Sequence, residues 1–590
     1  GITVYGSSYD ENHLLADTPT APKKKPSKAS ALFRAPKGPY ALAQINNDIY
    51  VVTVPLLGEK GAKINVKDAS EAAFPSRKLT KFGGQFPSWG PNGKVVYWTL
   101  GKTLFRYDIA KADAVGKAQK EESEAEKRAQ EKNDNNTAKD ASTEGGEKNG
   151  IKDYQAKEME VLVKAKRAIA RGLLALTNAT LITMEGEEII ENGTILIQDN
   201  RIESIGNNSK VIIPENAKVI DLKGKYLLPG FVDTHAHMWP AWGLHKKYVW
   251  VYAANLAYGV TTTRDPQTAT TDVLTYADMV EAGMMPGPRI YSTGPGVGYW
   301  GYNIKSLDHA RDVLKQYSKY YNTKTIKMYL TGNRQHRQWI IQAAKEQKLM
   351  PTTEGGLDFK LNVTQILDGY PGHEHSFPIY PLYKDFIDFV SASQTAYTPT
   401  LLVSYGGPWA ENYFFATENV QGDPKINRFT PKSELDAKSR RRNSGWFMEE
   451  EHVFKDHALF VKDLVESGGI AGVGSHGQLQ GLGYHWELWS MHAGGISNHD
   501  MLKVATILGA EALGLSKDLG SITTGKIADL VVLEKNPLEN IRHTNTISLV
   551  VKNGFVYEAE TLDKLYPSKE KQDYPWKQAV PSDELPGIGK

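Results

Sequence analysis

The sequence predicts an α/β protein built around a (β/α)8 TIM barrel, with a small β-sandwich formed by both flanks of the barrel and a partial β-propeller-like segment in front. Three observations lead to this prediction. Short apolar strands alternate with amphipathic stretches over residues 229–514, β-rich runs lie on both sides of that region, and a charged stretch precedes them. Strands that alternate with helices are typical of a parallel sheet.

We expect eight barrel strands, each a short run of apolar or β-branched residues. The stretches between them have helical periodicity, for example 307–321, 335–347 and 449–466. Eight such units in roughly 270 residues match the size of a TIM barrel, whose chemistry lies at the C-terminal ends of the strands. The expected strands are 230–233, 259–263, 288–292, 325–329, 350–353, a segment before His375, 396–402 and 470–474.

The segments that flank the barrel are predicted to be β-rich. Residues 161–228 and 515–565 contain runs of aliphatic and β-branched residues punctuated by Gly, Asn and Asp, so we expect one small β-sandwich built from both. Residues 566–590 are expected to be a C-terminal tail. Residues 110–160 consist mainly of Lys, Glu, Ala, Asn and Asp, which predicts a charged linker that is partly helical or disordered.

Residues 1–109 contain short β-forming runs separated by turns. An Asn92-Gly93 pair predicts a hairpin turn, and the surrounding Pro-Ser-Trp-Gly-Pro-Asn-Gly-Lys sequence resembles the repeat of TolB-like β-propellers. A propeller blade cannot bury both faces alone, and one or two blades fit before residue 110. We therefore expect partner blades upstream in the same precursor or in another chain, with a free-standing β-rich cap as the alternative.

Composition excludes several classes of function. The 70 Lys and Arg residues nearly balance 68 Asp and Glu residues, and a net charge of +2 does not favour nucleic acid as a partner. The absence of cysteine excludes disulfides, thiolate nucleophiles and Cys-ligated zinc. No apolar run is long enough for a membrane span, and the chain begins at Gly1, so we expect a soluble piece of a longer precursor.

Two histidines follow the first expected barrel strand. His235 and His237 are two residues apart, so on an extended chain both side chains point to the same face and can reach one divalent metal ion. A single His-x-His pair is weak evidence, because paired surface histidines are common. The surrounding sequence strengthens the prediction.

The run from Leu227 to His237 resembles the opening motif of the amidohydrolase superfamily. The resemblance continues through Gly259–Asp265 and Gly520–Val531 and covers about residues 172–560. Together with the propeller-like segment, the chain resembles TolB-propeller amidohydrolases. This resemblance implies a metallohydrolase barrel with one or two divalent ions, zinc first among them, and a periplasmic or secreted location.

The resemblance also implies metal ligands on other strands. The two histidines of the first strand match His235 and His237, the carboxylated lysine of the fourth strand matches Lys327, and the sixth-strand histidine matches His375. An ordinary lysine at the barrel rim is the alternative for Lys327. His373 is the alternative to His375, because both are expected on one face of the strand.

Two positions depart from the pattern of the superfamily. Glu354 lies near the position of the fifth-strand histidine, and His476 lies near that of the eighth-strand aspartate. The two changes compensate in charge, which favours a rearranged working site, with Glu354 and His476 as further metal ligands, over a decayed one. In this hypothesis Lys327 and His476 are catalytic: a metal-activated hydroxide attacks a carbonyl, and His476 accepts the proton.

The predicted function is hydrolysis of carbon–nitrogen bonds in an amide or peptide-like small molecule. An esterase, lactonase or organophosphate hydrolase that uses the same site is an alternative, as is a catalytically silent propeller–barrel binding protein. Loop residues expected to contact the substrate are Arg334, Arg337, Tyr405 and His485, where the two arginines would bind a substrate carboxylate. An exposed helix face explains the two arginines almost as well, and aromatic loop residues serve packing as often as recognition. A homo-oligomer is left open.

Overall fold

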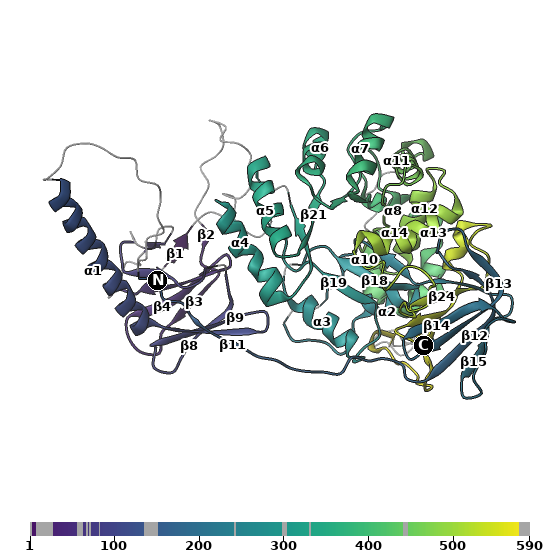
Figure 1. Ribbon diagram of the computed structural model, residues 1–590, viewed down its shortest axis with the longest axis horizontal. Helices are drawn as coiled ribbons and strands as arrows, with labels where there is room; N and C mark the ends of the chain where they lie inside the picture. Colours follow the sequence, from purple (N-terminus) through teal and green to yellow (C-terminus); the bar gives the residue numbers. More distant parts are fainter. Residues whose placement is uncertain are drawn as a thin grey trace, which may run out of the picture. The chain divides into compact units, whose positions relative to one another are not determined.

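The computed structural model describes residues 3–6, 27–55, 63–66, 69, 72–81, 83–134, 151–240, 243–268, 270–297, 304–329, 332–440 and 447–577. The chain divides into two compact units. Unit 1 contains Gly1–Lys164 and Trp300–Asn322, and unit 2 contains Ala165–Tyr299 and Thr323–Lys590. Figure 1 shows the elements of both units, coloured along the sequence.

Unit 1 contains two four-stranded antiparallel sheets. One has the order β3 (Ala31–Arg34), β4 (Tyr40–Ile45), β5 (Asp48–Thr53) and β7 (Ser76–Lys78). The other has the order β11 (Lys157–Glu160), β10 (Thr103–Asp108), β9 (Val95–Leu100) and β8 (Gln85–Trp89). The short strands β1 (Thr3–Gly6), β2 (Ser27–Lys28) and β6 (Lys63–Asn65) form a third sheet. Gly93, in the predicted turn between β8 and β9, has a φ of 66°, which suits glycine.

The predicted linker has more structure than a disordered segment. Helix α1 spans Ile109–Asp134 and is largely exposed, while residues 135–150 lie outside the described part of the chain. Strand β11, which we assigned to the linker, pairs antiparallel with β10, and all four of its residues are exposed. A solvent-facing edge strand needs no apolar residues, so composition alone does not reveal it.

Unit 1 also takes in a segment that the sequence assigns to the barrel. Helix α4 (Leu307–Lys315) and the π-helical turn Gln316–Tyr321 belong to unit 1. The ring of Tyr320 lies 5.5 Å from that of Phe105, and Lys319 Nζ lies 2.7 Å from a Glu158 carboxylate oxygen. Through these contacts the segment packs against the strands of unit 1.

The two β-rich flanks of the barrel region share one nine-stranded sheet in unit 2. Its order is β14-β13-β12-β16-β24-β25-β26-β27, and β15 also pairs with β12. Strands β16 and β24 connect the two flanks: they pair antiparallel with each other, and Tyr226 of β16 lies opposite Leu533 of β24. The strands are β12 (Leu173–Ile182), β13 (Ile189–Gln198), β14 (Arg201–Asn207), β15 (Lys218–Asp221), β16 (Tyr226–Pro229), β24 (Leu530–Leu533), β25 (Ile547–Lys552), β26 (Phe555–Glu558) and β27 (Lys564–Tyr566).

Short parallel strands occupy the region predicted as a barrel. The first parallel sheet contains β17 (Phe231–Asp233), β18 (Val260–Asp265) and β19 (Arg289–Ser292). The second contains β20 (Thr325–Met328), β21 (Met350–Glu354), β22 (Gly372–Glu374) and β23 (Ala396–Thr398). The expected eighth strand makes a single parallel bridge, from Ala471 to Tyr397. The prediction of an α/β fold is therefore confirmed.

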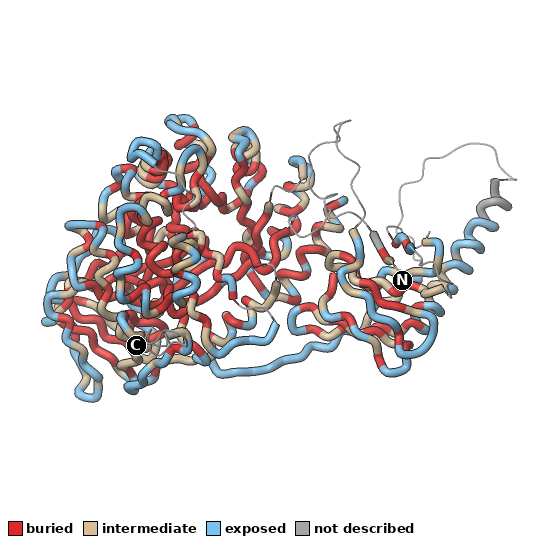
Figure 2. The backbone as a smooth tube through the Cα atoms, turned by 180° about the vertical axis from the view of Figure 1, so that it is seen from behind, coloured by how far each residue is buried: buried red, intermediate tan, exposed pale blue. Residues whose placement is uncertain are grey.

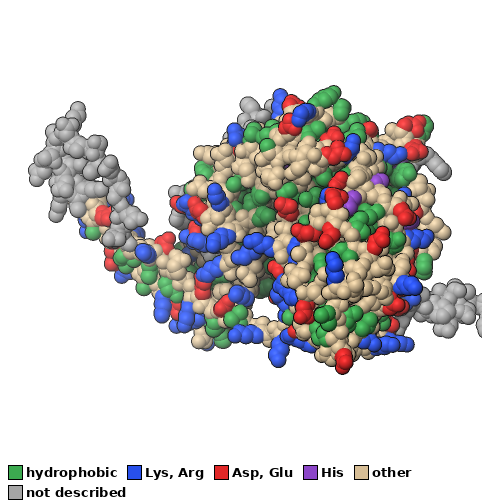
Figure 3. Space-filling model, turned by 45° about the vertical axis from the view of Figure 1, so that its right-hand side comes forward, with side chains coloured by type: hydrophobic (Ala, Val, Ile, Leu, Met, Phe, Trp, Pro, Cys, Tyr) green, Lys and Arg blue, Asp and Glu red, His purple; other side chains and the backbone are tan. Residues whose placement is uncertain are grey.

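Helices alternate with these strands, and most expose one face while burying the other (Figure 2). They include α2 (Trp250–Ala257), α3 (Asp272–Glu281), α5 (Arg334–Glu346), α6 (Phe359–Asp368), α7 (Lys384–Ser393), α8 (Ala410–Thr417), α9 (Pro424–Phe429), α10 (Lys432–Arg440), α11 (Phe454–Glu466), α12 (Leu482–His492), α13 (Asn498–Ala505) and α14 (Ile507–Ala512). Both acidic and basic side chains occur on the face of the molecule that Figure 3 shows. Within the described ranges, none of the helices is both long and apolar enough to span a bilayer.

Candidate metal centre

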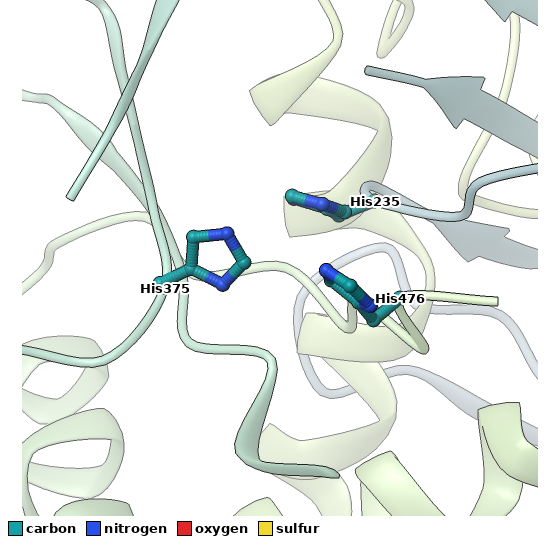
Figure 4. Close-up of side chains that lie close together, drawn as sticks. All are labelled: His235, His375 and His476. Atoms are coloured by element: carbon teal, nitrogen blue, oxygen red, sulfur yellow. The ribbon is translucent and has the colours of Figure 1, made fainter. Parts of the chain in front are cut away.

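Three histidines meet at the C-terminal ends of separate strands (Figure 4). His235 follows β17, His375 follows β22, and His476 follows the segment that bridges to β23. One ring nitrogen from each lies within 4.8 Å of the others, close enough for all three to reach one ion. The ring of His235 lies 5.1 Å, centroid to centroid, from both His375 and His476.

The backbone conformation at His375 decides which of two candidate histidines joins this cluster. Regular alternation would place His373 and His375 on one face, with Glu374 on the other. His375 instead has a φ of +72°, which breaks the alternation and turns its ring toward His235. His373 is buried away from the cluster, 4.6 Å from the ring of Phe377. Of the two alternatives, the structure thus brings His375 to the site.

Left-handed backbone recurs around the site. His476 has a φ of +58°, and Thr400 has a φ of +47°. A β-branched residue rarely adopts this conformation, which costs about 1–3 kcal/mol per residue and persists when surrounding contacts hold it. At Thr400 the side-chain hydroxyl lies 2.6 Å from His375 Nδ1. The strained backbone therefore serves to hold a ring of the cluster.

The other three predicted ligands adjoin the histidine cluster. The ring of His237 lies 4.8 Å from that of His476. Glu354, the last residue of β21, places one carboxylate oxygen 3.0 Å from His375 Nε2 and the other 2.7 Å from Lys327 Nζ. All six predicted ligands thus form one contiguous group at the same ends of the strands.

Burial determines the protonation states of the histidines. Burial lowers the pKa of His235 and of His476 well below its usual value; Lys327 is the next cause at His235, and the neighbouring histidines are the next cause at His476. Burial also lowers the pKa of His237 to about 4, with Lys327 adding to the effect. These rings are therefore neutral near pH 7, and the neutral imidazole is the form that binds a metal ion.

The carboxyl groups respond in opposite directions. Burial by itself raises the pKa of Glu354, but the charges of His375 and Lys327 and their hydrogen bonds lower it well below its usual value. Asp265 has no such cation, and burial raises its pKa to about 8 although the Met238 and Gln267 backbone N–H groups oppose the shift. Glu354 is therefore a firmly ionised carboxylate beside the histidines.

Several buried polar residues around the cluster were missed by the sequence analysis. Glu374 accepts hydrogen bonds from Arg264 and Thr352, and its other oxygen lies 2.5 Å from His235 Nδ1. Asp233 accepts from the backbone N–H groups of His235 and Ser475. A signal was present in the Gly372–His375 segment, because strand alternation places Glu374 opposite His373.

The structure does not bring both arginines into position to bind a substrate carboxylate. Arg334 Nε and Arg337 Nε donate to separate oxygens of Asp368 at 2.8 and 2.7 Å. The Arg337 side chain is only 4% exposed. Both arginines therefore bind the carboxylate of Asp368, where the sequence predicted that they would bind the carboxylate of a substrate.

His485 also lies away from the cluster. It sits on α12, fully buried, with Nδ1 3.1 Å from Thr544 Oγ1 and Nε2 3.0 Å from the Tyr258 carbonyl. Helix α12 is buried on nearly all sides, so its aromatic residues pack within the core and the packing alternative applies. Tyr405 remains beside the site, with its ring 6.5 Å from that of His375.

The chain is similar to several known proteins. Guanine deaminase from Escherichia coli strain K12 is 23% identical over 403 residues, which cover 62% of this chain and 86% of the deaminase. The crystal structure of a Xaa-Pro dipeptidase superimposes with a TM-score of 0.51 at 19% identity, covering 66% of this chain and 100% of the dipeptidase. Molinate hydrolase gives a TM-score of 0.51 at 17% identity, covering 66% and 94%.

The family model decides the assignment. Structural neighbours at such low identity show a shared fold and no more. The model of the amidohydrolase family matches residues 226–556, more than half of the chain, and this range contains all six residues of the candidate metal centre. The chain therefore belongs to the amidohydrolase family, a class of hydrolases that act on carbon–nitrogen bonds.

Proposed function

We propose that this protein is a metal-dependent hydrolase that cleaves amide-like carbon–nitrogen bonds at one rim of a (β/α)8 barrel. The observation that carries the proposal is the convergence of His235, His375 and His476 from three separate strand ends. Hydrogen bonds from residues 470–473 support the barrel, because they reach Tyr397 on one side and Thr234 on the other. Catalytic residues of such barrels gather at this end of the strands.

The donor set fits a borderline-soft divalent cation such as zinc. Three histidine imidazoles are a known catalytic zinc set that leaves a coordination position for water. His235 Nε2 is buried and has no hydrogen-bond partner among the described residues, as expected of an atom kept for a metal ion. One or two ions, when bound, would supply a Lewis acid that lowers the pKa of water and polarises a carbonyl group.

We assign the proton-accepting role to Glu354. Its carboxylate lies within hydrogen-bond distance of His375 in the cluster, and its side chain is 23% exposed, so water and substrate can approach it. His476 belongs to the cluster proposed to bind the ion, and an imidazole whose lone pair binds a metal ion is not available to accept the proton. Lys327, whose side chain is buried, holds the other Glu354 oxygen and thereby orients the carboxylate.

The proposed substrate class is supported by the family and by one side chain. The similar proteins include a deaminase and a dipeptidase, both named for reactions at carbon–nitrogen bonds. Tyr405 lies beside His375 and could contact a substrate group near the bond that breaks. We favour N-acyl amino acids and dipeptides, the peptide-like class, over purines.

Metal content and hydrolysis test the proposal together. The purified protein should contain zinc in stoichiometric amount by elemental analysis, and dialysis against a chelator should abolish hydrolysis of a panel of N-acyl amino acids and dipeptides until zinc is restored. Glu354→Gln should retain the zinc and lose at least about 100-fold in kcat, the range for a general base. Zinc-free wild-type protein would overturn the proposal, and zinc loss in Glu354→Gln would make Glu354 a ligand instead.

A further inference from the structure

We propose that Glu374 is a positioning residue that selects which ring nitrogen of His235 is free to bind the metal ion. The inference rests on the proposed metal-dependent function, and its test separates the two. Glu374 is the last residue of β22, and its side chain is fully buried.

The two carboxylate oxygens of Glu374 contact different groups. Oε1 accepts hydrogen bonds from Arg264 Nη2 and Thr352 Oγ1. Oε2 lies 2.5 Å from His235 Nδ1. Because Arg264 lies on β18 and Thr352 on β21, the carboxylate is held by side chains from two other strands, in different sheets, and meets a ring from the end of a third.

These contacts determine the tautomer of His235. An ionised carboxylate only accepts hydrogen bonds, so His235 Nδ1 must carry the proton in this pair. A neutral imidazole with a proton on Nδ1 has its lone pair on Nε2. That atom is buried and has no partner among the residues described, and His375 and His476 lie beside the same ring. Carboxylate partners of this kind orient metal-binding histidines in other proteins.

The carboxylate cannot readily turn away from His235. Arg264 donates through Nη2 to Glu374 and through Nε to the Thr234 carbonyl oxygen at 2.9 Å. The guanidinium group is therefore fixed to the backbone immediately before His235. The side chain of Arg264 is 3% exposed, so water does not compete for these bonds.

Glu374→Gln provides a sharp test because the two donors at Oε1 decide the orientation of the new amide. Arg264 and Thr352 both need an acceptor, so the amide oxygen should face them and the NH2 group should face His235. His235 Nδ1 must then accept, which moves the ring proton to Nε2 and removes the free lone pair. Size and packing are unchanged by the substitution. Thr352→Val is the matched control, because it removes one bond to the same carboxylate and leaves the acceptor at His235.

Zinc affinity is measured for the full chain by competition with a chromophoric chelator, with circular dichroism as the control for folding. Glu374→Gln should bind zinc on the order of 10–100-fold more weakly than the wild type, and Thr352→Val should bind within a few-fold of it. Wild-type affinity in Glu374→Gln would overturn the inference. A wild-type protein without zinc affinity would instead overturn the proposed function.

Two further variants keep the inference testable. In His235→Ala, which has no ring to orient, adding Glu374→Gln should cause no additional loss of affinity; a further loss would show that Glu374 acts elsewhere and would overturn the inference. If Glu374→Gln does not fold, Glu374→Asp serves in its place. The shorter carboxylate remains an acceptor but is drawn away from His235, so its zinc affinity should be reduced, and full affinity would overturn the inference.

Discussion

The buried pair of Arg337 and Asp368 gives a prediction that separates packing from substrate binding. Arg337→Ala removes Nε, which lies 2.7 Å from an Asp368 oxygen, and also the bonds from the guanidinium to the Gly332 carbonyl and to Thr364. The Asp368 side chain is completely buried. The substitution therefore leaves a buried carboxylate without its buried cation.

The expected loss of stability can be worked out from this geometry. Removing one partner of a buried ion pair costs about 3–5 kcal/mol. Unit 2 contains about 400 residues, which corresponds to an unfolding entropy of roughly 0.8 kcal/mol/K near Tm. Arg337→Ala should therefore lower the Tm of unit 2 by about 4–6 °C, as measured by scanning calorimetry.

Arg334→Ala is the matched control for this experiment. Arg334 contacts the same carboxylate at 2.8 Å, but its side chain is 55% exposed. Exposed ion pairs contribute about 0–1 kcal/mol, so the Tm should change by about 1 °C or less. Both variants should keep the KM of the wild type for N-acyl amino acids. A raised KM with an unchanged Tm in Arg337→Ala would show that this arginine binds substrate after all.

Three further predictions concern the metal centre. His476→Ala should lose both zinc by elemental analysis and turnover, while the Tm of the zinc-free protein stays within about 2 °C of wild type; retained zinc would refute the ligand role. The raised pKa of Asp265, about 8 through burial, lies above its ordinary 3.8, so the folded protein holds a proton that the unfolded chain releases. Stability of the zinc-free protein should thus fall as pH rises from 4 to 8, and Asp265→Asn should flatten the Tm profile over that range; an unchanged slope would contradict it. Gly474→Ala would place a Cβ 2.9 Å from His235 Cβ, which should cost about 1–3 kcal/mol and weaken zinc binding. Gly483→Ala, whose Cβ meets only ordinary contacts, should do neither.

Hydrophobic patterning predicted the parallel strands well. Strands such as β18 and β20 are buried on both faces and begin in the sequence with apolar or β-branched residues, although β18 ends in Arg264 and Asp265 and β20 contains Lys327. The segment 470–474 has the same pattern, yet it pairs with β23 through a single parallel β-bridge, Ala471 to Tyr397, and forms no regular strand. Backbone pairing depends on how the neighbouring strands are placed, which the pattern of one segment does not contain. Pattern therefore identifies which residues are buried better than it identifies how their backbones pair.

The candidate site was predicted to the extent that its residues carry metal-binding side chains. The six expected ligands are contiguous, but sequence alone left His373 and His375 as equal choices. The φ of +72° at His375 decides between them. Left-handed backbone is uncommon for residues other than glycine, so the sequence does not predict it at this histidine. Glu374 was overlooked because its role depends on Arg264 and Thr352, which are distant in sequence.

Loop arginines and aromatic residues were harder to assign. Arg337 and His485 carry side chains suited to substrate binding, yet both find partners within the protein. Asp368, the partner of Arg337, lies 31 residues away in the chain. Such pairs form only when helices α5 and α6 pack together, and periodicity within one helix contains no information about its neighbour.

The discontinuous composition of unit 1 has a consequence for any attempt to dissect the protein. The chain passes from one unit to the other at residues 164–165, 299–300 and 322–323. A fragment that ends at Lys164 would lack Tyr320 and so expose the face of Phe105 that this ring covers. A single proteolytic cut after α1 would divide unit 1 itself, because strand β11 and the segment Trp300–Asn322 would remain on the fragment that carries unit 2.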